Sequence, residues 1–134
     1  MLWPSAYGQG DSSFRAAGGE AGLRRLAEAF YAAMVRRPDA AIILAMHPTD
    51  LAESTDKLAR FLCGWLGGPP RYREKYGPIS IPRAHTHLAI GPAERDAWLA
   101  CMAEALERQD YAEDFKQYLL HALRVPAERC RTRD

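Results

Sequence analysis

The chain has 134 residues, of which 48% are hydrophobic and 26% are charged, so it has the size and composition of one folded domain and is not intrinsically disordered. Its 18 Lys and Arg residues are nearly balanced by 17 Asp and Glu, and the resulting charge of +1 leaves no basic surplus to hold a nucleic-acid backbone. The sequence has no apolar run long enough to cross a bilayer and no signal-peptide pattern, so we expect a cytoplasmic protein without nucleic-acid or membrane partners.

Three cysteines, Cys63, Cys101 and Cys130, are scattered along the chain and form no CxxC pair. Such a sparse, odd-numbered set cannot make the disulfide framework of a small secreted protein, which agrees with a reducing compartment. Cys101 has the neighbours of a small buried hydrophobic residue, and the sequence leaves open whether any of the three has a redox role.

Apolar residues recur at helical spacing in four long segments. The first runs from about Gly19 to Arg36 and ends before Pro38. The second begins after Pro48-Thr49-Asp50 and ends at Gly67-Gly68-Pro69-Pro70, where glycine suits a C-cap and proline blocks continuation. We also expect two short helices, Asp11 to Ala17 and Pro38 to Leu44.

The third long segment opens at Gly91-Pro92, with proline at the first helical position, and presents Trp98 and Met102 on its apolar face. The fourth covers about Ala112 to Leu123 and ends before Pro126. These four segments are the principal helices that the sequence predicts.

Between the second and third helices, the stretch from Tyr72 to Ala89 has a less regular pattern. Its residues 78–82 could form a short strand, but no second strand pattern is available to pair with it, so we expect a loop followed by a short helical turn. The prediction is an all-α chain forming one domain over residues 1–134. In it, residues 1–10 are an N-terminal extension and residues 126–134 a frayed tail.

The chain has four histidines, His47, His85, His87 and His121. On a helix, residues two apart point about 200° away from each other, so His85 and His87 could not hold one metal ion together from a helix. No HExxH or other zinc-ligand spacing is present. A single histidine can ligate a haem iron, but the local pattern alone favours a core histidine at position 85 and a surface residue at 121.

Several short motifs occur in a fixed order between Tyr7 and Ala127. They are Gly18-Gly19, Phe30-Tyr31, Gly67-Gly68-Pro69, Ala84-His85-Thr86-His87 and the run Ile90-Gly91-Pro92-Ala93-Glu94-Arg95-Asp96-Ala97-Trp98-Leu99. With these motifs the chain resembles the truncated haemoglobins, and among them group II. The resemblance implies a truncated globin-like fold, a two-over-two α-helical sandwich that encloses haem b.

The resemblance implies that His85 is the proximal ligand of the haem iron. The family's usual run after this ligand, Ala-Pro-Phe, is replaced here by Thr86-His87-Leu88, which makes His87 a rival ligand. The spacing from His85 to Ile90 and Trp98 matches the family pattern, which favours His85 over His87 as the ligand.

The resemblance also implies a polar distal pocket of Tyr31, His47 and Trp98, each expected to donate a hydrogen bond to a bound diatomic ligand. Without it, Tyr31 and Trp98 would be interpreted as core aromatics and His47 as a surface residue. Ser54 falls where larger globins carry a distal histidine, and its small side chain would leave an open path for ligands.

The remaining haem contacts that the resemblance implies are apolar walls and two propionate partners. Lys57 is nearly as well explained as an ordinary solvated helix lysine. The expected distal wall is Leu58, Phe61 and Leu62, the proximal side Leu88, Ile90 and Met102, and the propionate partners Lys57 and Tyr72.

By resemblance, the protein binds dioxygen, carbon monoxide and nitric oxide. Several donors in one pocket slow oxygen release, which favours NO dioxygenase or peroxidase-like chemistry with an external reductase over oxygen transport. Three alternatives remain open: a haem or gas sensor, a bis-histidine haem protein with His47 as second ligand, and a helical interaction module without cofactor. We expect a monomer or a homodimer.

Overall fold

The computed structural model describes residues 7–78, residue 80 and residues 85–134. No strand occurs among these residues, and the predicted all-α fold class is confirmed. The segment around residues 78–82, expected to be a loop, lies largely outside the described residues. The helices are α1 (Ser12–Ala16), α2 (Gly19–Arg36), the 3-10 helix η1 (Pro38–Ala40), α3 (Ala41–Ala45), α4 (Ala52–Trp65), α5 (Arg71–Tyr76), α7 (Pro92–Glu107) and α8 (Glu113–Arg129).

The end of α4 shows why the sequence carries a glycine pair there. Gly67 has a φ of +93°, and its N–H donates to the carbonyl oxygen of Gly64, while the N–H of Gly68 donates to that of Cys63 at 2.9 Å. These two bonds form a Schellman C-cap. A Cβ atom on Gly67 would lie 1.9 Å from the carbonyl oxygen of Gly10, so only glycine fits this turn.

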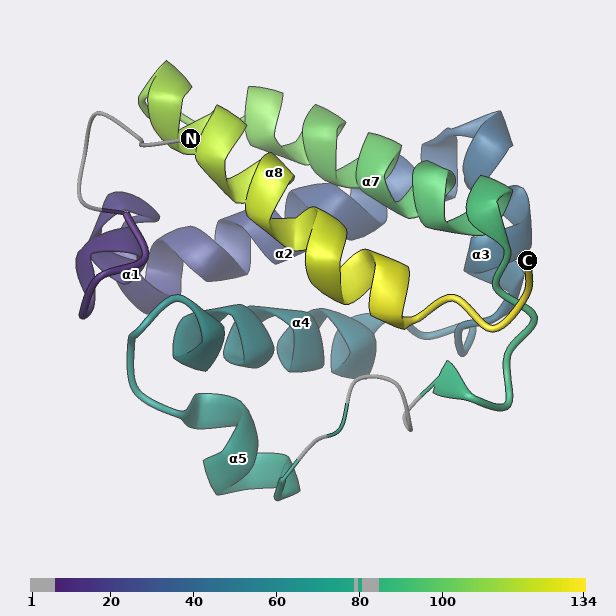
Figure 1. Ribbon diagram of the computed structural model, residues 1–134, viewed down its shortest axis with the longest axis horizontal. Helices are drawn as coiled ribbons and strands as arrows, with labels where there is room; N and C mark the ends of the chain where they lie inside the picture. Colours follow the sequence, from purple (N-terminus) through teal and green to yellow (C-terminus); the bar gives the residue numbers. More distant parts are fainter. Residues whose placement is uncertain (1–6, 79, 81–84) are drawn as a thin grey trace.

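The long helices pack in two pairs, as the two-over-two sandwich predicts. Helix α2 packs against α4 and against α7, and α7 packs against α8. Figure 1 shows α7 above α2 and α4 below it, with α8 crossing in front of α2. The large, fully buried side chains of the core include Phe30, Leu62, Met102, Phe115 and Leu119.

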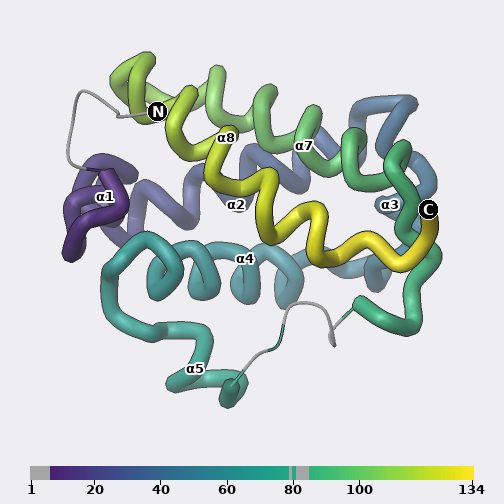
Figure 2. Tube along the Cα trace, in the orientation of Figure 1, coloured from purple at the N-terminus to yellow at the C-terminus, as the bar shows by residue number. Residues whose placement is uncertain are grey.

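Helix α8 extends further than the sequence predicts. It continues through Pro126 to Arg129, although proline inside a helix costs about 3 kcal/mol because it lacks an N–H donor. Ala127 is buried, and beyond the helix the N–H groups of Thr132 and Arg133 donate to the carbonyl oxygen of Ile90 at 2.7 and 2.9 Å. These contacts offset the cost and anchor the segment expected to fray. Figure 2 shows this tail meeting the chain just before α7.

Helix α5 was not predicted, because the sequence between Tyr72 and Ala89 lacks a regular apolar face. In the structure Arg71–Tyr76 forms a helix with no buried residue of its own. It packs against α4 and is held there by polar contacts to Asp56. This helix is therefore held in place by polar side-chain contacts to α4, which the spacing of apolar residues in the sequence does not reveal.

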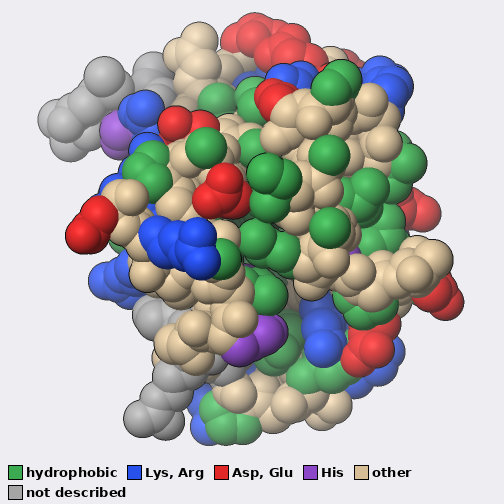
Figure 3. Space-filling view, turned by 90° about the vertical axis from the view of Figure 1, so that its right-hand side faces the viewer, with side chains coloured by type: hydrophobic (Ala, Val, Ile, Leu, Met, Phe, Trp, Pro, Cys, Tyr) green, Lys and Arg blue, Asp and Glu red, His purple; other side chains and the backbone are tan. Residues whose placement is uncertain are grey.

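The surface agrees with the balanced charge of the sequence. On the face shown in Figure 3, Lys and Arg side chains are interspersed with Asp and Glu, and no large patch of one sign forms. None of the helices in the described part of the chain combines the length and the apolar character needed to span a bilayer.

Candidate functional site

The three predicted distal residues are linked by a continuous series of ring contacts that runs through Phe30. Tyr31 on α2 meets His47, which follows α3, with ring centroids 5.4 Å apart and an interplanar angle of 75°. Phe30 contacts the ring of Tyr31 and the indole of Trp98 on α7, each at 5.0 Å between centroids. Side chains from three separate parts of the chain thus form one aromatic cluster with polar atoms at its edge.

Two of these residues carry hydrogen-bond donors without a protein partner. Among the residues that the structure describes, neither the Tyr31 hydroxyl nor the Trp98 indole N–H makes a hydrogen bond. Both side chains are partly buried against the core. Burial raises the pKa of Tyr31 to about 12, so its hydroxyl keeps its proton at neutral pH. Such unpaired donors in a partly desolvated place are available to a polar ligand.

His47 differs from the expectation that it acts as a donor. Its Nδ1 atom lies 2.8 Å from the carbonyl oxygen of Ile43. A carbonyl can only accept, so Nδ1 carries the ring hydrogen and donates it. In the neutral residue the other ring nitrogen, Nε2, is therefore an acceptor. His47 can donate from Nε2 only when the ring is protonated.

The two candidate proximal histidines lie in different environments. His85 is half-buried, and its Nδ1 atom lies 3.6 Å from the Sγ atom of Cys130 at the end of α8. His87 is exposed. Burial raises the pKa of Cys130 to about 11, so its thiol is protonated at neutral pH. The environment favours His85 over His87 as a ligand facing the interior.

The predicted apolar walls divide into core residues and residues at the edge of the core. Leu62 and Met102 are completely buried, and Ile90 is 8% exposed. Leu58 and Phe61 on α4 are only partly buried and pack against the same core cluster. The partly buried residues keep apolar surface for contact with a flat hydrophobic group.

The two predicted propionate partners meet at a residue that the sequence analysis missed. The Nζ atom of Lys57 lies 5.3 Å from the ring centre of Tyr76, and the Tyr72 ring lies 5.1 Å from that of Tyr76. Lys57 also pairs with Glu53 at 3.4 Å across one helical turn, as an ordinary helix lysine does. These contacts fit Lys57 both as a propionate partner and as an ordinary solvated helix lysine.

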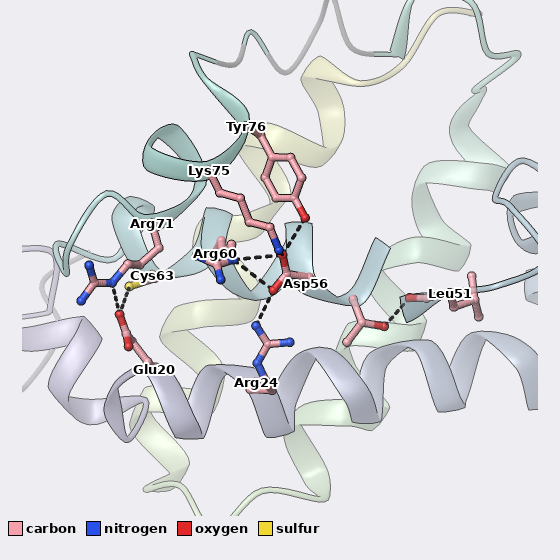
Figure 4. Close-up of polar contacts among 10 residues, drawn as sticks. Glu20, Arg24, Leu51, Asp56, Arg60, Cys63, Arg71, Lys75 and Tyr76 are labelled. Carbon is pink, nitrogen blue, oxygen red and sulfur yellow. Dashed lines mark hydrogen bonds and ion pairs between the residues drawn. The ribbon is translucent and has the colours of Figure 1, made fainter. Parts of the chain in front are cut away.

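Tyr76 belongs to a network centred on Asp56 (Figure 4). The Asp56 carboxylate accepts hydrogen bonds from Tyr76 at 2.6 Å, Lys75 at 2.8 Å, Arg24 at 2.6 Å and Arg60 at 2.9 Å. Burial alone would raise the pKa of Asp56, but these bonds outweigh it and hold the pKa well below its usual range. Only the Asp56–Arg60 spacing of four residues was visible in the sequence.

Comparisons with known proteins place this chain in one family. The bacterial-like globin family matches residues 12–129. The group 2 truncated hemoglobin YjbI of Bacillus subtilis is 31% identical over 109 residues, which are 81% of this chain and 80% of the relative.

Solved structures agree. The group II 2-on-2 haemoglobin of Agrobacterium tumefaciens is 34% identical, with 100% of both chains covered and a TM-score of 0.86. The truncated oxygen-avid haemoglobin of Bacillus subtilis is 29% identical, with 89% of this chain and 98% of the other covered and a TM-score of 0.81.

The chain therefore belongs to the bacterial-like globin family, and the predicted resemblance to group II truncated haemoglobins is confirmed. Its cofactor is haem b, and its function is the binding of ligands at haem. The residues present fit that group, because a half-buried histidine, partly covered apolar side chains on α4 and an unpaired, desolvated Tyr31 hydroxyl are all available.

Proposed function

We propose that this protein retains dioxygen at haem b ligated by His85, with Tyr31 and Trp98 as the donors that hold the gas. The observation that carries the proposal is the Tyr31 hydroxyl, which is desolvated, protonated at neutral pH and without a hydrogen-bond partner among the described residues. The description of the Bacillus subtilis relative as oxygen-avid supports it.

Haem b, when bound, supplies the iron at which dioxygen, carbon monoxide and nitric oxide bind. The chain supplies the surroundings. Tyr31 offers an O–H donor and Trp98 an N–H donor to the gas molecule held there. Leu58 and Phe61 exclude water from the ligand and so strengthen these bonds. Because its Nδ1 hydrogen is bonded to Ile43, His47 presents Nε2 as an acceptor, which competes with the gas for the Tyr31 hydrogen.

A second candidate function is the oxidation of nitric oxide by the retained dioxygen, or the reduction of peroxide. Donors that slow the loss of dioxygen keep it available for a second reactant, which favours these reactions over oxygen transport. Either reaction consumes electrons, which in this proposal come from an external reductase in the cytoplasm. The oxidation of nitric oxide is tested by measuring nitrate after nitric oxide is mixed with the oxygenated protein. A nitrate yield no higher than that in buffer without protein would exclude this reaction.

The main proposal is tested by the rate of oxygen release. Replacing Tyr31 with Phe, or Trp98 with Phe, removes one donor and should speed release roughly tenfold, since one hydrogen bond of about 1.4 kcal/mol corresponds to that factor. Stopped-flow displacement of dioxygen by carbon monoxide measures the rate. Unchanged release in both variants would contradict the donor account.

The matched control is Tyr111→Phe. Burial also raises the pKa of Tyr111 to about 12, but its hydroxyl donates to the carbonyl oxygen of Ala17 at 2.9 Å, away from the distal cluster. This variant should lose stability and leave oxygen release unchanged. Equal acceleration in Tyr31→Phe and Tyr111→Phe would show that loosened packing, and not a lost donor, sets the rate.

A further inference from the structure

The C-terminal end of the chain is bonded to the loop that follows His85. The Thr132 hydroxyl donates to the carbonyl oxygen of Leu88 at 2.5 Å and accepts from the N–H of Ile90 at 2.8 Å. The carbonyl oxygen of Ile90 in turn accepts from the N–H groups of Thr132 and Arg133. These four bonds hold the tail against residues 88–90, and Figure 1 shows the two segments meeting beside α7.

Cys130 lies two residues before this clamp, at the C-cap of α8. Its backbone N–H bonds back to the carbonyl oxygens of Pro126 and Ala127, both at 3.2 Å, so the last turn of the helix fixes the cysteine from one side. The clamp at Thr132 fixes it from the other. The sulfur atom is thereby held 3.6 Å from Nδ1 of His85.

We infer that Cys130 is a positioning residue for His85, its sulfur accepting the Nδ1 hydrogen of the imidazole. The inference rests on the proposed role of His85 as the proximal ligand. A histidine that binds iron through Nε2 carries its hydrogen on Nδ1, and an acceptor at Nδ1 sets the tautomer and the orientation of the ring.

The choice of sulfur has a chemical consequence. Thiol sulfur is a weak acceptor, whereas a hydroxyl oxygen is a strong one. The weaker the acceptor at Nδ1, the less electron density the imidazole gives to the metal. Cys130 therefore orients His85 while leaving it a weaker electron donor than it would be beside an oxygen acceptor.

Two substitutions and one control separate this role from a packing role. Cys130→Ala removes the acceptor, Cys130→Ser supplies a stronger one of similar size, and Cys63→Ala removes a thiol that is 1% exposed and bonded to the carbonyl oxygen of Pro69. The readouts are the iron–histidine stretching frequency of the reduced protein by resonance Raman spectroscopy and the rate of haem transfer to apomyoglobin.

We expect Cys130→Ala to lower the stretching frequency and to speed haem transfer roughly tenfold, the lower end of the range for second-shell changes at metal sites. Cys130→Ser should raise the frequency above that of the unaltered protein, and Cys63→Ala should leave it unchanged. A frequency that is unchanged in Cys130→Ala, or that shifts equally in Cys130→Ala and Cys63→Ala, would overturn the inference.

The variant His85→Ala distinguishes this inference from the proposed function on which it rests. If the iron–histidine band disappears in His85→Ala but does not respond to Cys130→Ala or Cys130→Ser, His85 is the ligand and only the role of Cys130 is wrong. If the band persists in His85→Ala, the ligand assignment fails, and the inference fails with it.

Discussion

The Nδ1 atom of His47 lies 2.8 Å from the carbonyl oxygen of Ile43, so the ring hydrogen of the neutral residue is committed to that bond. The remaining nitrogen can accept from the neighbouring Tyr31 hydroxyl, which competes with donation from Tyr31 to a bound gas. We therefore expect His47→Phe to slow oxygen release about fivefold, a change of about 1 kcal/mol. If His47 were instead a donor to the gas, the same substitution would speed release.

The double variant provides the control for that prediction. In a Tyr31→Phe background the hydroxyl is absent, so adding His47→Phe should leave the release rate unchanged, and the coupling between the two changes measures the competition. Identical effects of His47→Phe in both backgrounds would show that the histidine acts on the gas without Tyr31. The sequence could place these two residues by resemblance, but the tautomer depends on how the turn after α3 folds back on Ile43, which no motif encodes.

At the scale of helices, Asp56 joins α2, α4 and α5 by accepting hydrogen bonds from four side chains, and its own side chain is 14% exposed. Replacing it with Asn leaves the surrounding cations without their counter-charge, and we expect a loss of about 2 kcal/mol in the free energy of unfolding at pH 7. Urea denaturation of the haem-loaded protein measures it. Asp39→Asn is the control, because Asp39 pairs with Arg37 at the surface and its loss should change stability little.

The lowered pKa of Asp56 also predicts how the stability difference between the unaltered protein and Asp56→Asn changes with pH. A carboxyl group whose pKa is lower in the folded state contributes stability above its unfolded pKa, near 4, and loses that contribution as the pH falls toward the folded value. The stability difference between the unaltered protein and Asp56→Asn should therefore be constant between pH 5 and 7 and shrink below about pH 4. A difference that does not change down to pH 3 would contradict the charge network.

The outcome for the helices shows what periodicity can and cannot supply. The bounds of α2 and the start of α7 follow from glycine and proline at their ends, and both were predicted. Helix α5 was missed because it buries none of its own residues. The end of α8 was placed too early because the contacts that tolerate Pro126 come from residues 90 and 132, far away in sequence.

For the whole molecule, the fold was predictable because the four long apolar faces and the ordered motifs agree with one another. The predicted distal residues lie on α2, after α3 and on α7, and the sequence alone gives each a plain structural interpretation. Only the resemblance links them. The contact between Cys130 and His85 joins residues 45 apart, and no spacing rule points to it.

Because the proposed site draws on both helix pairs and on the loop after position 85, haem should act as a link that stabilises the whole molecule. At a haem concentration 100 times its dissociation constant, the added stability is about 2.7 kcal/mol, which corresponds to a rise of roughly 5–10 °C in the Tm. Thermal unfolding of the haem-free protein titrated with haem measures this rise.

The histidine variants identify the residue through which haem stabilises the fold. His85→Ala should largely abolish the dependence of the Tm on haem concentration, because a ligand can stabilise the fold only through contacts that the unfolded chain lacks. His87→Ala and His121→Ala should retain this dependence. Loss of the dependence in His87→Ala and its retention in His85→Ala would reassign the proximal ligand. A Tm independent of haem in the unaltered protein would contradict a folded state stabilised by haem.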